Sequence, residues 1–158
     1  MINVQLDTSE LDQSLRHLSQ ATSNLYPPLD EIGDALESNI ALLFVDQQSP
    51  DGQPWKPLSD VTLQRRRQGS GSGSSQILQD SGILKNSFTH HADRHSVAVG
   101  TAVEYAPTHQ FGATKGQYAH GVPWGDIPAR PFMPEERLPT DWENEVMDII
   151  TQHLEDAL

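Results

Sequence analysis

The chain has 158 residues, the size of a single domain, and we expect one domain over residues 1–158. Its apolar content of 35% is low for a self-sufficient globule, so we expect additional surface to be buried against other copies of the chain. The net charge of -12 excludes broad, non-specific binding to nucleic acid, because acidic surfaces repel phosphate. The absence of cysteine excludes a disulfide framework and thiolate metal sites.

The first third of the chain predicts a strand followed by two helices. Apolar residues alternate with polar ones over residues 2–6, as in a short strand with one buried face. Leucines recur at helical spacing over 11–18, with Thr8 or Ser9 available as the cap. An apolar stripe at steps of three and four predicts a long amphipathic helix over 29–45. The chain start lacks a signal-peptide pattern and no stretch approaches the roughly 18 apolar residues of a membrane helix, so we expect a soluble protein.

A turn, a short helix and a low-complexity tract follow. Pro50-Asp-Gly52 predicts a turn, and Trp55, which stands between two prolines, is expected to dock as an aromatic anchor. Ser59 is positioned to cap a short helix that reaches Arg67. Glycine and serine dominate residues 69–75, which predicts a flexible loop and not a domain boundary.

The segment after this loop predicts an antiparallel hairpin. Residues 83–90 indicate a helical turn that leads into a strand. Val97 and Val99 fall on one face of a second strand over 95–100, and residues 92–94 are expected to lie near the turn between the strands. The hairpin is the predicted centre of a small sheet.

Residues 103–105 are expected to extend this sheet, and Pro107 to limit further pairing. The stretch 105–112 is interpreted as a corner. Residues 112–134 are rich in glycine, proline and aromatic residues and show little periodicity, which predicts an extended loop or arm.

The C-terminal segment predicts a second amphipathic helix. Apolar residues from Trp142 to Leu154 share one helical face, and Thr140 or Asp141 is available as the cap. The elements together predict an α+β fold. In it, a small, mainly antiparallel β-sheet is packed by the long helix of the N-terminal half and by this C-terminal helix.

Seven histidines raise the question of a metal site or a catalytic base. His90 and His91 are adjacent, so in a strand they point to opposite faces and cannot converge on one ion. We therefore interpret the histidines as solvated or hairpin residues. His109 or His120 could act as a base, but no serine on a nucleophile elbow and no cysteine accompanies them. We expect no metal, no cofactor and no catalysis; a histidine-dependent metal hydrolase is the alternative from a different functional class.

A basic cluster, Arg65-Arg66-Arg67, lies beside the glycine/serine tract. Cations at a helix end favour the helix dipole, so a solvated helix end is one interpretation. Contact with an acidic patch on a sister subunit is a second, because the rest of the chain is so acidic. Contact with DNA is a third, against which the net charge argues.

An acidic face is predicted on the C-terminal helix, formed by Asp141, Glu143, Glu145 and Asp148. Solvation alone explains such a face in many proteins. If subunits close into a ring, the same carboxylates would line a channel through which DNA slides without sticking.

Six short blocks occur in one order along the chain, and none carries nucleophile, metal or phosphate chemistry. They are Pro50-Asp-Gly-Gln-Pro-Trp-Lys-Pro-Leu-Ser59, Thr62-Leu-Gln-Arg-Arg66, Ile77-Leu-Gln-Asp-Ser-Gly-Ile-Leu84, Val97-Ala-Val-Gly-Thr101, Tyr105-Ala-Pro-Thr-His-Gln-Phe-Gly112 and Ile127-Pro-Ala-Arg-Pro-Phe132. In this order they resemble the phage virion morphogenesis family, which includes the Mu-like G proteins and the tail-completion S proteins of P2-like phages. The resemblance covers nearly the whole chain.

The resemblance implies a structural virion protein that acts in tail completion or head–tail joining at the neck, the head-proximal end of the tail. A tail terminator that caps the tube is the alternative. It also implies a homo-oligomer, with a hexameric ring as the first expectation. Implied partners are other neck and tail proteins: the connector or stopper, the tail terminator, and the tail tube or sheath. The implied location is the virion after assembly in the host cytoplasm, with no membrane, and with DNA only as cargo passing through the lumen.

The resemblance carries over no catalytic residues, so the candidate site is an interface. In a docked arm, Trp124 and Phe132 would fill pockets on a neighbour, and Arg130 would act as an ion-pairing fork. A proline-rich arm suits this role because a rigid backbone loses less entropy on docking. The alternative is that the arm wraps its own core. Trp55 and the basic cluster complete the candidate interface.

Overall fold

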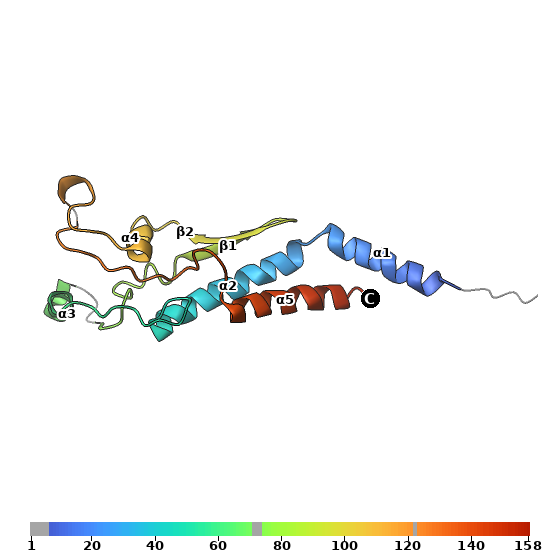
Figure 1. Cartoon of the computed structure of the whole chain (residues 1–158), viewed down its shortest axis with the longest axis horizontal. Coiled ribbons are helices and arrows are strands. Elements are labelled where there is room, and N and C mark those ends of the chain that lie inside the picture. The colour runs from blue at the N-terminus through green and yellow to red at the C-terminus, as the bar shows by residue number, and fades with distance from the viewer. Residues whose placement is uncertain (1–6, 71–73, 122) are drawn as a thin grey trace, which may run out of the picture.

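The computed structural model describes residues 7–70, 74–121 and 123–158 (Figure 1). Its elements in chain order are α1 (Ser9–Ser23), α2 (Tyr26–Asp46), α3 (Asp60–Arg65), the π-helix η1 (Arg66–Ser70), β1 (Phe88–Ala92), β2 (Val97–Thr101), α4 (Ala106–Phe111), the 3-10 helix η2 (Ala119–Gly121) and α5 (Thr140–Glu155). The predicted α+β class is confirmed. The strand predicted over residues 2–6 lies outside the described residues, as do residues 71–73 of the predicted flexible loop.

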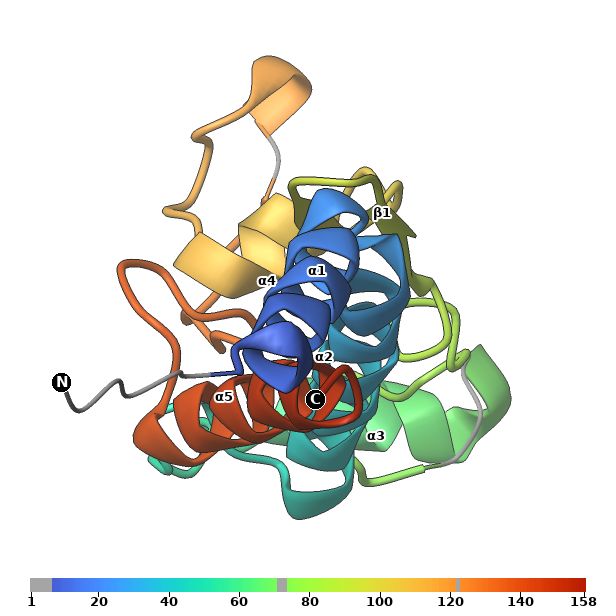
Figure 2. The same ribbon diagram turned by 90° about the vertical axis from the view of Figure 1, so that its right-hand side faces the viewer.

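Helix α2 is the centre of the fold. The β1–β2 hairpin lies along one side of α2 and α5 along another, so α2 contacts both (Figures 1 and 2). The helix begins three residues before the predicted range, because Pro27 and Pro28 fit the first turn, where their fixed φ is already helical and no N–H is required. It ends at Asp46, and Gln47 takes the left-handed conformation that closes many helices.

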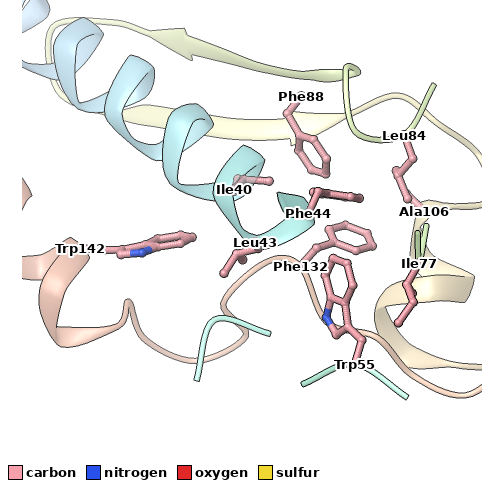
Figure 3. Close-up of a cluster of buried hydrophobic side chains, with 10 residues drawn as sticks. All are labelled: Ile40, Leu43, Phe44, Trp55, Ile77, Leu84, Phe88, Ala106, Phe132 and Trp142. Atoms are coloured by element: carbon pink, nitrogen blue, oxygen red, sulfur yellow. The ribbon is translucent and has the colours of Figure 1, made fainter. Parts of the chain in front are cut away.

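The core gathers around Phe44, near the C-terminal end of α2 (Figure 3). Its ring centroid lies 5.3 Å from that of Trp55, 5.9 Å from Phe88 and 5.8 Å from Phe132. Aromatic pairs at these distances contribute about 0.5–1.5 kcal/mol each beyond the area that they bury. Phe44 thereby joins α2 to the turn that follows it, to β1 and to the segment around Phe132.

The predicted hairpin is confirmed. Strands β1 and β2 pair antiparallel, with Phe88 opposite Thr101 and Ala92 opposite Val97. Asp93 forms the turn, because its carboxylate accepts hydrogen bonds from the backbone N–H groups of His95 and Ser96 at 2.7 and 2.8 Å. The same bonds lower the pKa of Asp93, with the bond from His95 the largest cause.

Two expectations for the segment after β2 are wrong. Residues 103–105 form a turn and no third strand, because the N–H of Ala106 bonds back to the carbonyl of Val103. The predicted corner is the short helix α4, which Pro107 favours by occupying its first turn.

The helix caps agree with the prediction only in part. Thr8 occupies the cap position of α1 but makes no side-chain cap hydrogen bond; instead the carboxylate of Asp7 accepts a hydrogen bond from the N–H of Ser9 at 3.0 Å. Helix α5 starts at Thr140, so Thr140 and Asp141 lie in its first turn and Pro139 occupies the cap position. The Ser59 cap of α3 is confirmed, since its hydroxyl accepts from the N–H of Thr62.

Helix α1 does not pack as a core helix. It extends past the C-terminal end of α5, which it contacts (Figure 1). None of its residues is buried, and Nε2 of His153 on α5 lies 3.3 Å from the carbonyl oxygen of Ala21. Within the described ranges no helix is long and apolar enough to cross a membrane.

Candidate interaction surfaces

The arm over residues 126–134 wraps the chain's own core. Phe132 is 1% exposed, and its N–H donates to the side-chain oxygen of Gln110 at 3.0 Å. The indole N–H of Trp55 donates to the carbonyl of Pro131 at 2.7 Å. The intramolecular alternative therefore describes Phe132 and Trp55, and in this conformation neither side chain is open to a neighbour.

Arg130 also turns inward. Its Nε donates to the carbonyl of Lys56 at 2.8 Å and its Nη2 to that of Pro57 at 3.0 Å. Burial lowers the pKa of Arg130, and the nearby charge of Arg66 lowers it further. Arg130 is a fork, as predicted, but its partners are backbone carbonyls of its own chain and not carboxylates of a neighbour.

The three arginines of the basic cluster differ in their contacts and in their exposure. The side chain of Arg66 is 11% exposed, and its Nη1 donates to the carbonyls of Ser74 and Gln76 at 3.0 and 2.8 Å, while its Nε lies 3.6 Å from Asp80. Arg66 therefore joins the two sides of the glycine/serine loop. Arg65 and Arg67 are exposed and face solvent.

Among the aromatic candidates, Trp124 remains outside the core. It is 81% exposed, on a loop that begins and ends where Ala113 and Ile127 pair by two backbone hydrogen bonds. Inside the loop, the N–H of Lys115 donates to Asp126 at 2.8 Å. Both views show this loop standing away from the body (Figures 1 and 2). A large, exposed aromatic on an anchored loop is well placed for contact with a partner.

The acidic face on α5 needs a correction. Successive helical residues turn by 100°, so Glu143 and Glu145 lie about 200° apart and cannot share one face. Asp141, Glu145 and Asp148 do share one side, and all are exposed. Glu145 also reaches α2, where it accepts a hydrogen bond from Asn39 at 2.6 Å.

Charge is divided unequally between two parts of the chain. Residues 7–46 and 140–158, which contain α1, α2 and α5, carry fourteen Asp and Glu against the single base Arg16. Residues 47–139 carry eight acids and nine bases. Almost all of the net negative charge thus lies on the three long helices, where it repels phosphate.

His90 occupies a site that the sequence interpretation missed. Its Nδ1 lies 2.7 Å from Glu37 and its Nε2 lies 3.3 Å from Asp30, with Asp34 at 3.9 Å. Of the two expectations for the histidines, His90 meets the second: it lies in the hairpin, opposite Val99, and it is not solvated, because its side chain is 15% exposed. His91 points to the opposite face and is exposed, as the strand geometry predicts.

The hydrogen bond to Glu37 raises the pKa of His90; burial opposes this rise, and Asp30 and Asp34 add to it. A sequence signal for the site did exist: Asp30, Asp34 and Glu37 follow helical spacing around Gly33. Among the residues that the structure describes, no group of three or more His, Asp or Glu has an arrangement that could hold a metal ion.

His109 and His120, the other two candidate bases, lie in different surroundings. Nδ1 of His109 is buried and has no hydrogen-bond partner within the described part of the chain. Burial lowers the pKa of His109, and the charge of Arg130 adds to this, so the ring is neutral near pH 7. Its neighbour is the edge of the Tyr105 ring, 5.8 Å away between centroids. His120 lies in an exposed turn.

The chain is similar in sequence to known phage proteins. The sequence profile of the phage virion morphogenesis family matches residues 6–155. The Mu-like prophage FluMu G protein 2 of Haemophilus influenzae is 32% identical over 135 residues, which cover 84% of this chain and 83% of that protein. The putative capsid assembly protein G of Escherichia phage Mu is 31% identical over 158 residues, or 99% of this chain and 96% of that protein.

No solved structure gives a significant match. The relatives carry the names of phage and prophage proteins, one of them an assembly protein, and neither is named as an enzyme. The family profile and the relatives both cover most of the chain. The chain therefore belongs to the phage virion morphogenesis family.

Proposed function

We propose that this virion-assembly protein is a non-enzymatic neck component, which completes the tail or joins it to the head. The family match across residues 6–155 is the observation that carries the proposal. The surfaces support it: the exposed features include an aromatic loop, Arg65 and Arg67, and acidic helices, all of which suit binding to other proteins. In this proposal the protein assembles in the host cytoplasm and ends in the virion at the head–tail junction.

The proposed assembly is a ring of identical subunits, six in the first instance. The side of α5 that carries Asp141, Glu145 and Asp148 would face the lumen. Like charges repel, so an acidic wall lets DNA pass without binding it. The acidic excess on the three long helices supports this orientation, because it supplies negative charge over a broad surface and not at one point.

Contacts with the other neck and tail proteins fall on the opposite part of the chain. Trp124 would insert into a pocket on a partner such as the connector, the tail terminator, the tube or the sheath. Arg65 and Arg67 would pair with carboxylates on a neighbour. Trp55, Arg66, Arg130 and Phe132 support these surfaces from within.

Loss of the gene from the phage tests the proposal. We expect filled heads and complete-length tails that do not join, and we expect a plasmid copy of the wild-type gene to restore joined particles. Tails of uncontrolled length would instead favour the terminator role, since an uncapped tube keeps growing. A normal yield of infectious particles without the gene would contradict both roles.

A further inference from the structure

A pocket of about 590 Å³ lies at the end of the molecule opposite α1 (Figure 1). Its walls come from α3, residues 78–84, α4 and residues 126–130. Two arginines line it, and both are largely withdrawn from water: the side chain of Arg66 is 11% exposed and Arg130 is 6% exposed. Arginines that are buried to this extent are seldom left without an anionic partner.

Arg130 is a buried cation that lacks a counter-ion. Among the described residues, no Asp or Glu forms an ion pair with its side chain. Its Nε and Nη2 donate to the uncharged carbonyls of Lys56 and Pro57, and Nη1 makes no hydrogen bond to a residue that the structure describes. Burial lowers the pKa of Arg130 and the charge of Arg66 lowers it further, so its positive charge is disfavoured where it stands. An anion in the pocket would relieve this.

His109 is a second polar group in the pocket wall that lacks a partner. Its carbonyl accepts the N–H of Arg130 at 2.7 Å, so the two residues are neighbours. Nδ1 of its ring is buried and bonds to no residue in the described ranges. Burial keeps this ring neutral by lowering its pKa, and the charge of Arg130 adds to the effect. An anion beside Arg130 would offset that charge and favour the protonated imidazole.

The two acids of the pocket wall are engaged elsewhere. Asp80 lies 3.6 Å from Nε of Arg66 and balances that arginine. Asp126 accepts the N–H of Lys115 at 2.8 Å, in the loop that carries Trp124. Both carboxylates still act on an incoming anion, because they repel a doubly charged group such as phosphate more strongly than a singly charged one. The wall therefore favours an anion with one charge.

We propose that this pocket binds a carboxylate group, with Arg130 as its principal cation. The guanidinium edge formed by Nη1 and Nη2 presents parallel N–H groups that match the two oxygens of a carboxylate. The group would belong either to an Asp or Glu side chain of a partner protein or to a small free acid. The net charge of -12 disfavours a nucleic acid as the source of the anion. The inference goes beyond the proposed function and does not depend on it.

Nuclear magnetic resonance of the histidine rings tests the site in the purified, full-length protein. Acetate and acetamide are the matched probes, because they have nearly the same shape and differ in charge, and sodium chloride controls for ionic strength. We expect saturable shifts of the His109 signals with acetate alone, and a rise in the pKa of His109 when acetate is bound. The signals of the exposed His91 should not move. The H109Q variant identifies the signals.

Two blocked tripeptides distinguish the sources of the carboxylate. Acetyl-Gly-Glu-Gly-amide carries one side-chain carboxylate, and acetyl-Gly-Gln-Gly-amide is its uncharged match. Binding of acetate and of the Glu peptide supports the site and assigns it to a side chain of a partner protein. Binding of acetate without the Glu peptide supports the site and assigns it to a small free acid. Equal binding of the two peptides overturns the inference.

A substitution at the edge of the pocket tests its charge without changing either arginine. Ser81 lines the pocket and is exposed, so both S81D and S81N should fold. S81D adds a carboxylate, and S81N makes nearly the same change in size without a charge. We expect S81D to bind acetate at least about fivefold more weakly than S81N, the effect of one like charge in water. R130Q should abolish binding; where R130Q does not fold, the S81D and S81N pair still decides.

Three results would each overturn the inference: no saturable effect of acetate on His109, equal binding of acetate and acetamide, or equal binding of acetate by S81D and S81N. Tighter binding of inorganic phosphate than of acetate would also overturn it, because the pocket would then select a more highly charged anion. These readouts use purified protein, so they stand or fail separately from the phage phenotype that tests the proposed function.

Discussion

The ring of His90 lies directly against the backbone of Gly33. A Cβ atom at position 33 would stand 2.2 Å from Cδ2 of His90, far inside contact distance. This approach joins β1 to α2 and places the ring between Glu37 and Asp30. Glycine in a helix interior costs about 1 kcal/mol relative to alanine, and at this position the open space is what admits the histidine.

Replacement of Gly33 by alanine should therefore destabilise the protein despite the better helix propensity of alanine. We expect a loss of about 1–3 kcal/mol in the free energy of unfolding, as for other overpacked sites. Urea unfolding followed by circular dichroism measures it. In H90A/G33A the clash is absent, so alanine at position 33 should be neutral or stabilising relative to H90A alone. Equal costs of G33A in both backgrounds would contradict the packing that we describe.

The stability of the protein should decline as the pH rises above the ordinary histidine value of 6.5. The hydrogen bond to Glu37 raises the pKa of His90 in the folded state, so the contribution of protonated His90 is fully present below 6.5 and is lost as the pH passes the folded-state pKa. Urea unfolding at a series of pH values should show this decline in the wild type and in H91Q, whose imidazole is exposed, but not in H90Q. A decline of the same size in H90Q would assign it to other groups.

The elements with a regular apolar pattern could be predicted from the sequence. The apolar stripes of α2 and α5 each extend over several turns, and the alternation of Val97 and Val99 marks β2. Helix α4 was missed because six residues are too few to show a helical period, and Tyr105 and Pro107 there also suit a turn. The site of His90 was missed because it depends on residues 53 and 60 positions away, which only the packing of β1 on α2 brings together.

For the candidate interface, the sequence indicated which residue types take part in docking but not the surface on which they dock. Proline and aromatic content indicates that an arm docks, but it does not say on which surface. Phe132 and Arg130 dock on their own chain, and Trp124, from the same segment, does not. The difference arises from Gln110, whose side chain bonds the backbone of Phe132 and Met133 and holds that part of the arm on the core.

Arg130 should stabilise the fold through the shape of its guanidinium group, which reaches two carbonyls, and not through its charge alone. Replacement by lysine keeps the charge but lacks the planar fork whose Nε and Nη2 reach the carbonyls of Lys56 and Pro57. A hydrogen bond from a charged donor contributes about 1.5–3 kcal/mol, and its loss should appear as a lower urea midpoint with an unchanged slope. R137K makes the same change at an exposed position and should shift the free energy of unfolding by less than about 0.5 kcal/mol. Equal midpoints for the two variants would contradict this role.

Purified protein should contain no stoichiometric transition metal. The imidazole of His90 is directed at carboxylates of α2, Nδ1 of His109 is buried, and the described residues contain no group of three or more His, Asp or Glu that could hold a metal ion. Elemental analysis by mass spectrometry, before and after dialysis against zinc, measures the content, and H90Q is the matched control. One zinc or iron per chain that is lost in H90Q would revive the metal-hydrolase alternative.

Phe132 and Trp124 should separate folding from assembly. Phe132 fills the centre of the core, and F132A should lower the free energy of unfolding by about 3–5 kcal/mol. Trp124 is 81% exposed, so W124A should leave the free energy of unfolding unchanged within about 0.5 kcal/mol. If Trp124 anchors a partner, the W124A gene should fail to restore joined particles in a phage that lacks the wild-type gene, although the protein is folded and abundant. W124F keeps an apolar ring and should restore them in part. Full restoration by W124A would remove this loop from the proposed contact with neck proteins and would leave Arg65 and Arg67 as the exposed candidates.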